Sequence, residues 1–185
     1  MNAAVTQTVT QFAAELADRE AIRDLLLRYA RATDRCDAAL LTAVFWPDAT
    51  TDYEGFHVGA IAPYIVKSTE SMREQMEQTA HLIGNMLIEI DGDTARGETY
   101  VFAFHRLPGA DGPKDLLLGG RYLDRFAKRD DCWRITHRRL VADWFREFPD
   151  SGDWNQGFFG LRMKSGSRSP NDPSYESTFT YQPAK

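Results

Sequence analysis

The chain has 185 residues, of which 43% are hydrophobic and 12% aromatic, and 22 basic against 27 acidic residues give a net charge of −5. This length suits one domain with a sizeable core, and the acidic balance argues against nucleic acid as a partner. The N-terminus lacks the pattern of a secretory signal, and no apolar run approaches the ~18 residues that a membrane span requires. We therefore expect a cytoplasmic protein with no membrane partner.

The N-terminal third carries helical patterns. From residue 17 to residue 34, apolar side chains recur at steps of three and four, which is the period of an amphipathic helix, and Asp18 is the expected N-cap. A shorter helix is predicted in "DAALLTAVF", with Asp37 as its N-cap, and it ends before the proline of "WPDAT".

Strand patterns dominate the middle of the chain. "ATTDYEGFHVG" predicts a strand and a turn, and "AIAPYIVKSTESMREQMEQ" predicts a further helix. Strands are then expected in "HLIGNMLIEIDGD", "TARGETYVFAFHRL", "DLLLGGRYLDRFAKRDD" and "CWRITHRRLVADW". Asp91-Gly92-Asp93 and Asp130-Asp131 mark hairpin corners between them. Helices followed by an antiparallel meander predict an α+β fold rather than a parallel sheet.

Neither cysteines nor histidines show the spacing of a metal site. Cys36 and Cys132 lie far apart in sequence without a Cys-x-x-Cys or Cys/His pattern, so both are expected to be free thiols. The four histidines fall in different segments, and no glycine-rich phosphate loop precedes a helix. The sequence therefore predicts no metal and no organic cofactor.

Candidates for acid–base chemistry lie on separate predicted elements. They are Asp34 at the end of the first long helix, Tyr53 and His81 on strands, His105 near a strand end, and Arg138 or its neighbour Arg139 in the last strand. Each side chain alone also has a structural interpretation, such as a helix end, a half-buried aromatic or a solvated face. If the sheet curls around the first helix, all of them can point into one cavity.

A second set of side chains is expected to bind substrate. Asn85 shares a strand face with His81 and Ile83 by the period of two, and its amide can hydrogen-bond a substrate oxygen. Tyr29 and Phe102 are the aromatic candidates for the same cavity. Aromatic and aliphatic residues with a few polar groups suit a small, largely apolar or aromatic substrate.

Three stretches carry a family resemblance. "YARATDRCD", "TAHLIGN" and "GRYLDRFAKRDDCWRITHRRLV", with the spacing between them, resemble the SnoaL-like branch of the nuclear transport factor 2 superfamily, whose enzymic members include scytalone dehydratase and hexachlorocyclohexane dehydrochlorinase. The resemblance implies a cone-shaped α+β barrel, in which a strongly curved mixed or antiparallel sheet of about four to six strands wraps the N-terminal helix.

The chain divides where the resemblance ends, and the apolar outer face expected of such a sheet, together with the composition of the tail, favours assembly. Residues 1–146 would form the barrel domain, and residues 147–185 a C-terminal extension that packs on the barrel or on a neighbouring subunit. The extension is rich in aromatic residues for a segment of polar composition, namely Trp154, Phe158, Phe159, Tyr175, Phe179 and Tyr181. We expect a homo-oligomer, with a trimer favoured over a dimer.

Specific roles follow from the resemblance. An aspartate matching Asp34 orients a histidine matching His81, and this pair abstracts a proton from carbon. Residues matching Tyr53 and His105 act on the substrate's oxygen, and an arginine matching Arg138 assists the leaving group. Scytalone dehydratase has a tyrosine where this chain has Thr33, so scytalone itself is not the expected substrate.

The predicted function is that of a cofactor-independent lyase. It would act on an aromatic or polycyclic alcohol by Asp-His general-base catalysis and eliminate water or a small group such as formaldehyde, as a dehydratase or a diarylpropane lyase does. One alternative is an isomerase or cyclase that uses the same base with no leaving group. Another is a non-catalytic binding or oligomerisation subunit like the small subunit of ring-hydroxylating dioxygenases, and the presence of Asp34 and His81 counts against it.

Overall fold

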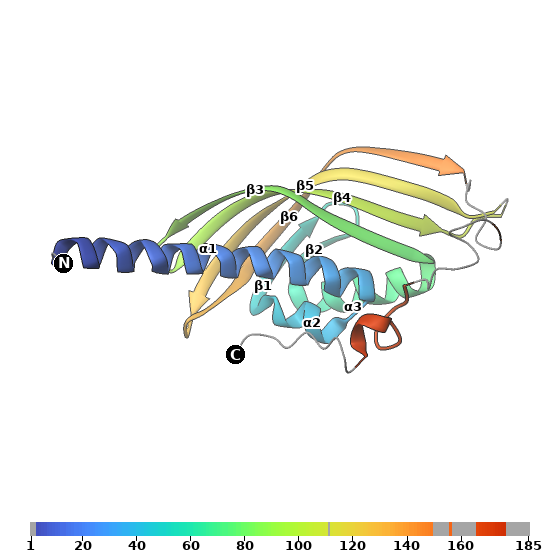
Figure 1. Ribbon diagram of the computed structural model, residues 1–185. Helices are drawn as coiled ribbons and strands as arrows, with labels where there is room; N and C mark the ends of the chain where they lie inside the picture. The colour runs from blue at the N-terminus through green and yellow to red at the C-terminus, as the bar shows by residue number, and fades with distance from the viewer. Residues whose placement is uncertain (1–2, 111, 150–155, 157–165, 177–185) are drawn as a thin grey trace.

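The computed structural model describes residues 3–110, 112–149, 156 and 166–176, with side chains from Val9 onward. In these residues the helices are α1 (Ala3–Arg35), α2 (Ala38–Ala43) and α3 (Ile61–Gln75), followed near the C-terminus by a short 3-10 turn, η1 (Pro173–Tyr175). The strands are β1 (Phe45–Tyr53), β2 (His57–Ala60), β3 (Gln78–Asp91), β4 (Thr94–Leu107), β5 (Lys114–Arg129) and β6 (Cys132–Pro149). Figure 1 shows α1 lying along a strongly curved sheet.

The strands form one mixed sheet in the order β2-β1-β6-β5-β4-β3. All neighbouring pairs are antiparallel except β1 and β6, which run parallel. The predicted hairpin corners have the left-handed backbone that tight turns require, with φ of 56° at Gly92 and 50° and 57° at Asp130 and Asp131. The expected α+β class and curved mixed sheet are confirmed.

Helix α1 covers the inner, concave face of this sheet. Ile22, Leu26 and Tyr29 are almost completely buried there, and full burial of each aliphatic side chain contributes about 2 kcal/mol. The helix begins at Ala3, far before the predicted start, so the expectation that Asp18 is its N-cap is wrong. Asp18 instead accepts a hydrogen bond from Trp133 Nε1 at 2.8 Å, which fixes the helix against β6.

The shorter helices follow the sequence patterns closely. Asp37 caps α2 as predicted, because its Oδ1 accepts a hydrogen bond from the Leu40 N–H at 2.9 Å. Helix α3 buries Ile61, Tyr64 and Ile65 against the core. Strand β6 runs to Pro149, three residues beyond the boundary expected for the barrel domain.

The faces of the sheet alternate in the middle of β4, from Thr99 to Ala103. Val101 and Ala103 are buried on the inner face, whereas Tyr100 and Phe102 are exposed on the outer face. A bulge between Ile83 and Met86 breaks this alternation in β3. A second irregularity lies at Gly119 and Gly120 in the pairing of β5 with β6.

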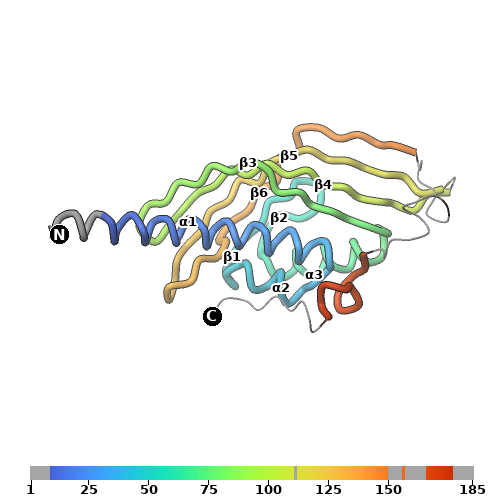
Figure 2. Tube along the Cα trace, viewed as in Figure 1, coloured from blue at the N-terminus to red at the C-terminus, as the bar shows by residue number. Residues whose placement is uncertain are grey.

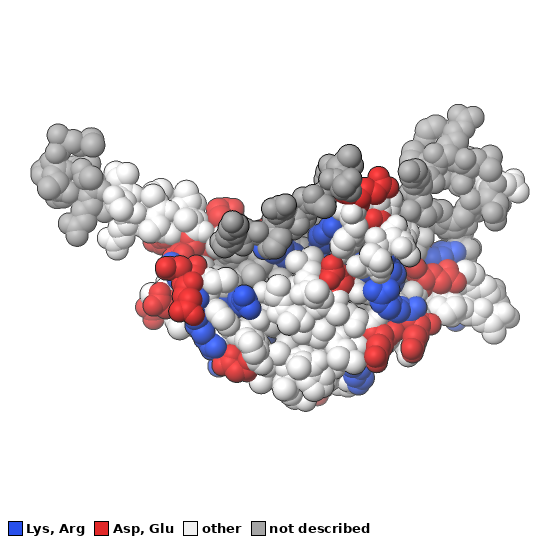
Figure 3. Space-filling view, turned by 90° about the horizontal axis from the view of Figure 1, so that it is seen from below, with Lys and Arg blue, Asp and Glu red and all other residues white. Residues whose placement is uncertain are grey.

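On the side of the molecule shown in Figure 3, the described residues do not form a large patch of one charge sign. Lys and Arg side chains intermingle with Asp and Glu near its margins, around a largely uncharged centre. No helix in the described part of the chain is long and apolar enough to cross a membrane.

Candidate active site

Asp34 and His81 form a hydrogen-bonded pair on the inner side of the sheet. Asp34 lies in the last turn of α1, and His81 is the fourth residue of β3. The His81 Nδ1–H donates to Asp34 Oδ1 at 2.6 Å, and the backbone N–H of His81 donates to Asp34 Oδ2 at 2.8 Å. Their side chains are only 14% and 6% exposed, respectively. The predicted hydrogen-bond contact between these two residues is confirmed.

The surroundings of Asp34 keep its carboxylate ionised. Burial by itself raises the pKa of Asp34, but the hydrogen bonds and charge of His81, together with a hydrogen bond from Thr79, lower the pKa below its ordinary value. A carboxylate oxygen can only accept a hydrogen bond, so the proton of the neutral His81 ring lies on Nδ1. Nε2 is therefore the nitrogen that can accept a proton.

His105 lies beside His81 as a second, neutral imidazole. The two rings are 5.5 Å apart and nearly perpendicular, at 88°. Burial, and then the charges of His81 and Arg168, lower the pKa of His105 to about 4. Its Nδ1 is buried without a hydrogen-bond partner. At neutral pH, His105 can polarise a neighbouring oxygen by hydrogen bonding but supplies no positive charge.

A second polar group joins three tyrosines in the core. Tyr29 Oη lies 2.7 Å from Tyr53 Oη and 2.8 Å from Tyr64 Oη. Burial and then the neighbouring tyrosines raise the pKa values of Tyr53 and Tyr64 well above the ordinary value. These phenols therefore stay neutral and act as hydrogen-bond donors and acceptors.

Arg138 completes this second group. Its side chain is fully buried between the rings of Tyr29 and Tyr122, with its guanidinium carbon 3.9 Å and 4.0 Å from their centroids. Nε and Nη2 both donate to the Asp124 carboxylate at 2.7 Å. Burial opposes the charge, yet Asp124 raises the pKa of Arg138 well above its ordinary value. The pair is a neutralised unit inside the core.

The strand registers separate the two polar groups. His81 pairs with Ala103, whereas Arg138 pairs with Asp124 and Asp124 pairs with Gly97, six positions from Ala103 along β4. Six strand residues correspond to about 20 Å between backbones. The described contacts thus form two clusters, with Asp34, His81 and His105 in one and Tyr29, Tyr53 and Arg138 in the other. The clusters come nearest along α1, where Tyr29 and Asp34 are five residues, or about 7.5 Å of helix rise, apart.

Buried polar atoms without partners occur in and near both groups. Each such atom costs free energy unless another polar group satisfies it. Among the described residues they include Thr33 Oγ1, Thr51 Oγ1, Thr99 Oγ1, His105 Nδ1 and Arg138 Nη1. This set offers hydrogen-bonding positions inside an otherwise apolar core.

Two expected substrate-binding residues do not share the face of His81. The bulge in β3 gives Met86 the inner position opposite Thr99, and Asn85 is exposed. Phe102 is 42% exposed on the outer face, where its ring contacts Trp144 at 5.5 Å. The expectation that Asn85 and Phe102 line the cavity of His81 is therefore wrong.

Several members of the two groups were not predicted from sequence. Tyr64 follows Ile61 at the helix period, and Tyr122 shares the strand period of Phe126, so both fall at core positions. A hydroxyl at such a position was the signal available in the sequence. Asp124 follows the same strand period as a carboxylate on an apolar face. Arg168 lies in a segment of polar composition, where no periodic pattern marks it.

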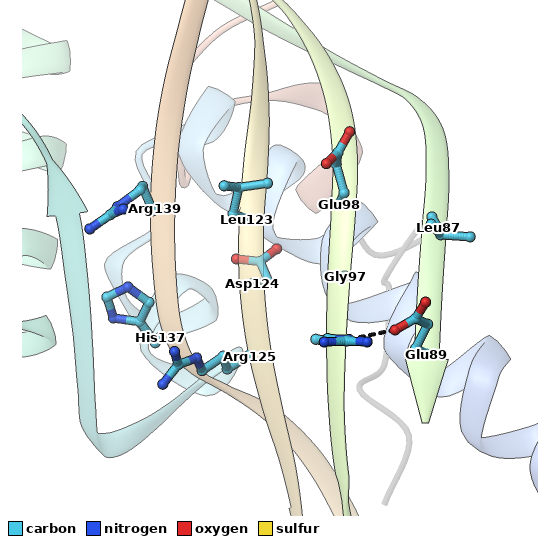
Figure 4. A pocket seen from close by; sticks show the side chains of 10 residues that line it. Leu87, Glu89, Gly97, Glu98, Leu123, Asp124, Arg125, His137 and Arg139 are labelled. Carbon is cyan, nitrogen blue, oxygen red and sulfur yellow. Dashed lines mark hydrogen bonds and ion pairs between the residues drawn. The ribbon is translucent and has the colours of Figure 1, made fainter. Parts of the chain in front are cut away.

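A groove of about 450 Å³ lies on the outer face of the sheet, and its lining includes Asp124, the partner of Arg138. Figure 4 shows mixed charges in it, with Glu89 bonded to Arg96 on β3 and β4, and Arg125 beside His137 on β5 and β6. No three His, Cys, Asp or Glu side chains gather into a metal-binding arrangement in the described residues. Both cysteines are free thiols, as expected.

Comparisons with known proteins agree with this architecture. Residues 14–139 match the family described as a SnoaL-like domain. An uncharacterised protein of Mycobacterium tuberculosis is 33% identical over 126 residues, which cover 68% of this chain and 85% of that protein.

Three solved structures share the fold. A proposed scytalone dehydratase from Novosphingobium aromaticivorans has a TM-score of 0.67 at 22% identity and covers 76% of this chain and 93% of that chain. Hexachlorocyclohexane dehydrochlorinase type 3 from Novosphingobium barchaimii has a TM-score of 0.66 at 20% identity, covering 72% and 92%. The beta subunit of a proposed aromatic-ring-hydroxylating dioxygenase from Novosphingobium aromaticivorans has a TM-score of 0.57 at 21% identity, covering 72% and 94%. At these identities the likeness establishes the fold alone.

Proposed function

This chain belongs to the SnoaL-like domain family, and from that membership and the Asp34–His81 pair we propose that it is a cofactor-independent lyase. Its substrate is an aromatic or polycyclic alcohol, from which it eliminates water or a small group such as formaldehyde. The observation that carries the proposal is the 2.6 Å bond from His81 Nδ1 to a buried carboxylate. A dioxygenase beta subunit that only binds or assembles has no need of such a pair.

The chemistry assigns one role to each member of the pair. His81 Nε2 takes a proton from the carbon next to the leaving group, and Asp34 stabilises the imidazolium that forms. When water is lost, the electrons of the broken carbon–hydrogen bond form the double bond, and the hydroxyl departs with the C–O pair and takes a proton back from the imidazolium. When formaldehyde is lost from a diol, His81 takes the hydroxymethyl O–H proton instead, the C–C bond to that carbon breaks with its electrons forming the double bond, and the hydroxyl on the neighbouring carbon departs as water with the same returned proton. His105 lies next to His81 and, as a neutral hydrogen-bond donor, polarises the departing oxygen.

The roles predicted for Tyr53 and Arg138 stay predictions. Both belong to the second polar group, with Tyr29 and Tyr64, and the pairing of Arg138 with Asp124 favours a structural role for that guanidinium. A Tyr53→Phe variant that folds normally but loses turnover would support direct action of Tyr53 on the substrate.

A substrate screen tests the proposal. Lignin-derived diaryl diols and hydroxysteroids are incubated with the protein, and ultraviolet absorbance follows the formation of a conjugated alkene. His81→Gln and Asp34→Asn should each lower turnover by about 10²–10⁴-fold, because they remove the base or its orienting carboxylate. The double variant should be little worse than the poorer single variant, since the residues act as one unit.

The controls separate this lyase from its alternatives. His137→Gln changes a histidine that bonds Thr50 away from the pair and should leave turnover unchanged. Activity should survive exhaustive chelation and dialysis, and its loss with restoration by added metal would contradict the proposal. A product of unchanged mass would identify an isomerase instead. If both pair variants stay within a few-fold of the parent, the pair is not catalytic.

A further inference from the structure

The described part of the C-terminal extension lies against the end of α1 that carries Asp34. Residues 166–176 pass below the C-terminal end of α1 and beside α3 (Figure 2). The family match ends at residue 139, so this segment is outside the part of the chain that the family accounts for. Its contacts therefore involve residues that the family match does not cover.

Arg168 is the residue of this segment that approaches the pair. Its Nη1 donates to the backbone carbonyl of Asp34 at 2.6 Å and to Thr79 Oγ1 at 2.6 Å. Its Nη2 donates to the carbonyl oxygens of Met72 and Met76 at 3.4 Å and 3.2 Å. One guanidinium thus joins the ends of α1 and α3 to the start of β3.

These bonds reach Asp34 by two routes. The carbonyl groups of the last helical turn have no partner within the helix, so the bond to the Asp34 carbonyl holds that turn and places a positive charge at the negative end of the helix dipole. Thr79 accepts a hydrogen bond from Arg168, and its hydroxyl lies close enough to the Asp34 carboxylate to help lower the pKa of that group by hydrogen bonding. The accepted bond directs the Thr79 hydroxyl hydrogen away from Arg168 and toward that carboxylate.

Several further bonds hold the segment in place. The Ser169 N–H donates to the Arg35 carbonyl at 2.7 Å, and Tyr175 Oη donates to Asp37 Oδ2 at 2.6 Å. Asp172 is buried and accepts from the Ser167 and Ser174 N–H groups at 2.9 Å and 3.0 Å. Arg168 therefore does not depend on its own contacts alone for its position.

We propose that Arg168 is a positioning residue for the Asp34–His81 pair. Through its bonds to the Asp34 carbonyl and the Thr79 hydroxyl, it holds the Asp34 carboxylate in the position from which it accepts the hydrogen bond of His81. The inference rests on the proposed function, because it assigns the extension to the same catalytic pair. It makes residues 166–176 a part of the active-site support rather than an appendage of the barrel.

The test compares two matched arginine substitutions in the full-length protein. Arg168→Met removes the bonds to Asp34 and Thr79. Arg73→Met is the control, because Arg73 also donates to carbonyls at the same helix end and in the same segment, Cys36 at 2.8 Å and Ser169 at 3.1 Å, but has no described contact with Asp34 or Thr79. Arg168→Lys keeps the positive charge but has fewer hydrogen-bond donors, and it serves as the main variant if Arg168→Met fails to fold.

The first readout is the tautomer of His81, measured from its ring nitrogen shifts by long-range proton–nitrogen correlation NMR at mildly alkaline pH. The parent and Arg73→Met should hold the Nδ1–H form, whereas Arg168→Met should give the averaged signal of an unrestrained imidazole. The second readout is turnover, where Arg168→Met should lower kcat roughly 10- to 100-fold at little change in KM. Arg168→Lys should recover part of both.

The proposal is overturned if Arg168→Met keeps the parent's tautomer signal, or if Arg73→Met changes that signal as much as Arg168→Met does. The second result would mean that any loosening of the segment disturbs the pair. The tautomer readout needs no substrate, so a failed substrate screen would count against the lyase while leaving the role of Arg168 measurable.

Discussion

At the scale of single residues, environment decides what each ionisable side chain does. Arg138 and Arg139 are neighbours in β6, yet Arg138 is fully buried and bidentate with Asp124, whereas Arg139 is 57% exposed and pairs with Asp52. A buried pair is costly to break because it leaves an unpaired charge in the core, while an exposed pair contributes little.

His105 makes stability depend on pH. Its pKa is about 4 in the folded protein, facing His81, Asp34 and Arg168, and about 6.5 in the unfolded chain. Between these two pKa values the unfolded state therefore binds more protons than the folded state. The free energy of unfolding accordingly decreases as pH falls from about 6.5 toward 4. Between pH 7 and pH 5 this amounts to about 2 kcal/mol.

Urea unfolding at these two pH values measures the effect. His105→Asn cannot titrate, so its free energy of unfolding should fall about 2 kcal/mol less than that of the parent over the same interval. All other titrating groups are common to both proteins and cancel in the comparison. Equal losses in the two proteins would show that His105 has no depressed pKa.

At the scale of elements, glycines let the long strands lie close and bend. A Cβ at Gly119 would lie 2.2 Å from the Trp144 ring, and a Cβ at Gly120 would lie 2.4 Å from the Val141 carbonyl oxygen. Both glycines sit where the register of β5 with β6 shifts. Neither has a positive φ, so the requirement is for space and not for a left-handed backbone.

Gly120→Ala should therefore destabilise the sheet, because the Val141 carbonyl belongs to the paired strand and cannot move aside freely. We expect a loss of roughly 1–3 kcal/mol in the free energy of unfolding. Gly84→Ala is the matched control in β3, where the added Cβ would meet Tyr100 at an ordinary 3.4 Å, and it should change stability by less than about 1 kcal/mol. Chemical denaturation of both variants checks the difference, and equal stabilities would contradict the steric argument.

At the scale of the whole molecule, the outer face of the sheet carries an apolar row. Leu82, Phe102, Gly119 and Trp144 are cross-strand partners on four consecutive strands, and Leu82 is 69% exposed. Gly119 has no side chain, which leaves room for Trp144 to reach Phe102 across the sheet. An exposed apolar surface of this kind is typical of an interface between protein chains.

We therefore still predict a homo-oligomer, with a trimer favoured over a dimer, built on this face. Sedimentation at micromolar concentration should show the assembly, and Leu82→Glu should weaken it by placing a charge in the apolar contact. Val66→Glu is the control, because Val66 is 55% exposed on α3, away from the sheet. A monomeric parent, or equal dissociation by both variants, would contradict the assignment of this face.

The extension was expected to pack on the barrel or on a neighbouring subunit, and that division of the chain stays a prediction. Of the aromatic residues behind it, Tyr175 lies in the described segment, where it bonds Asp37. Trp154, Phe158, Phe159, Phe179 and Tyr181 lie outside the described residues.

Local patterns in the sequence determined the α+β class and the order of the elements. Helix and strand periods depend on near neighbours in the chain, and tight turns such as Asp91-Gly92-Asp93 force consecutive strands to pair, so these features can be read locally. Family resemblance then placed one carboxylate and one imidazole opposite each other, and the 2.6 Å contact agrees.

Only the tertiary structure decided which side chains share a face or a contact. The bulge in β3 turned Asn85 away from His81, and a bulge is an extra residue that no period of two reveals. The curvature of the sheet and the strand registers put Tyr53 and Arg138 in a group apart from the pair. Arg168 reaches Asp34 across 134 positions of the chain. Such contacts depend on the closing of long loops and on packing between distant segments, and therefore they leave no local signal in the sequence.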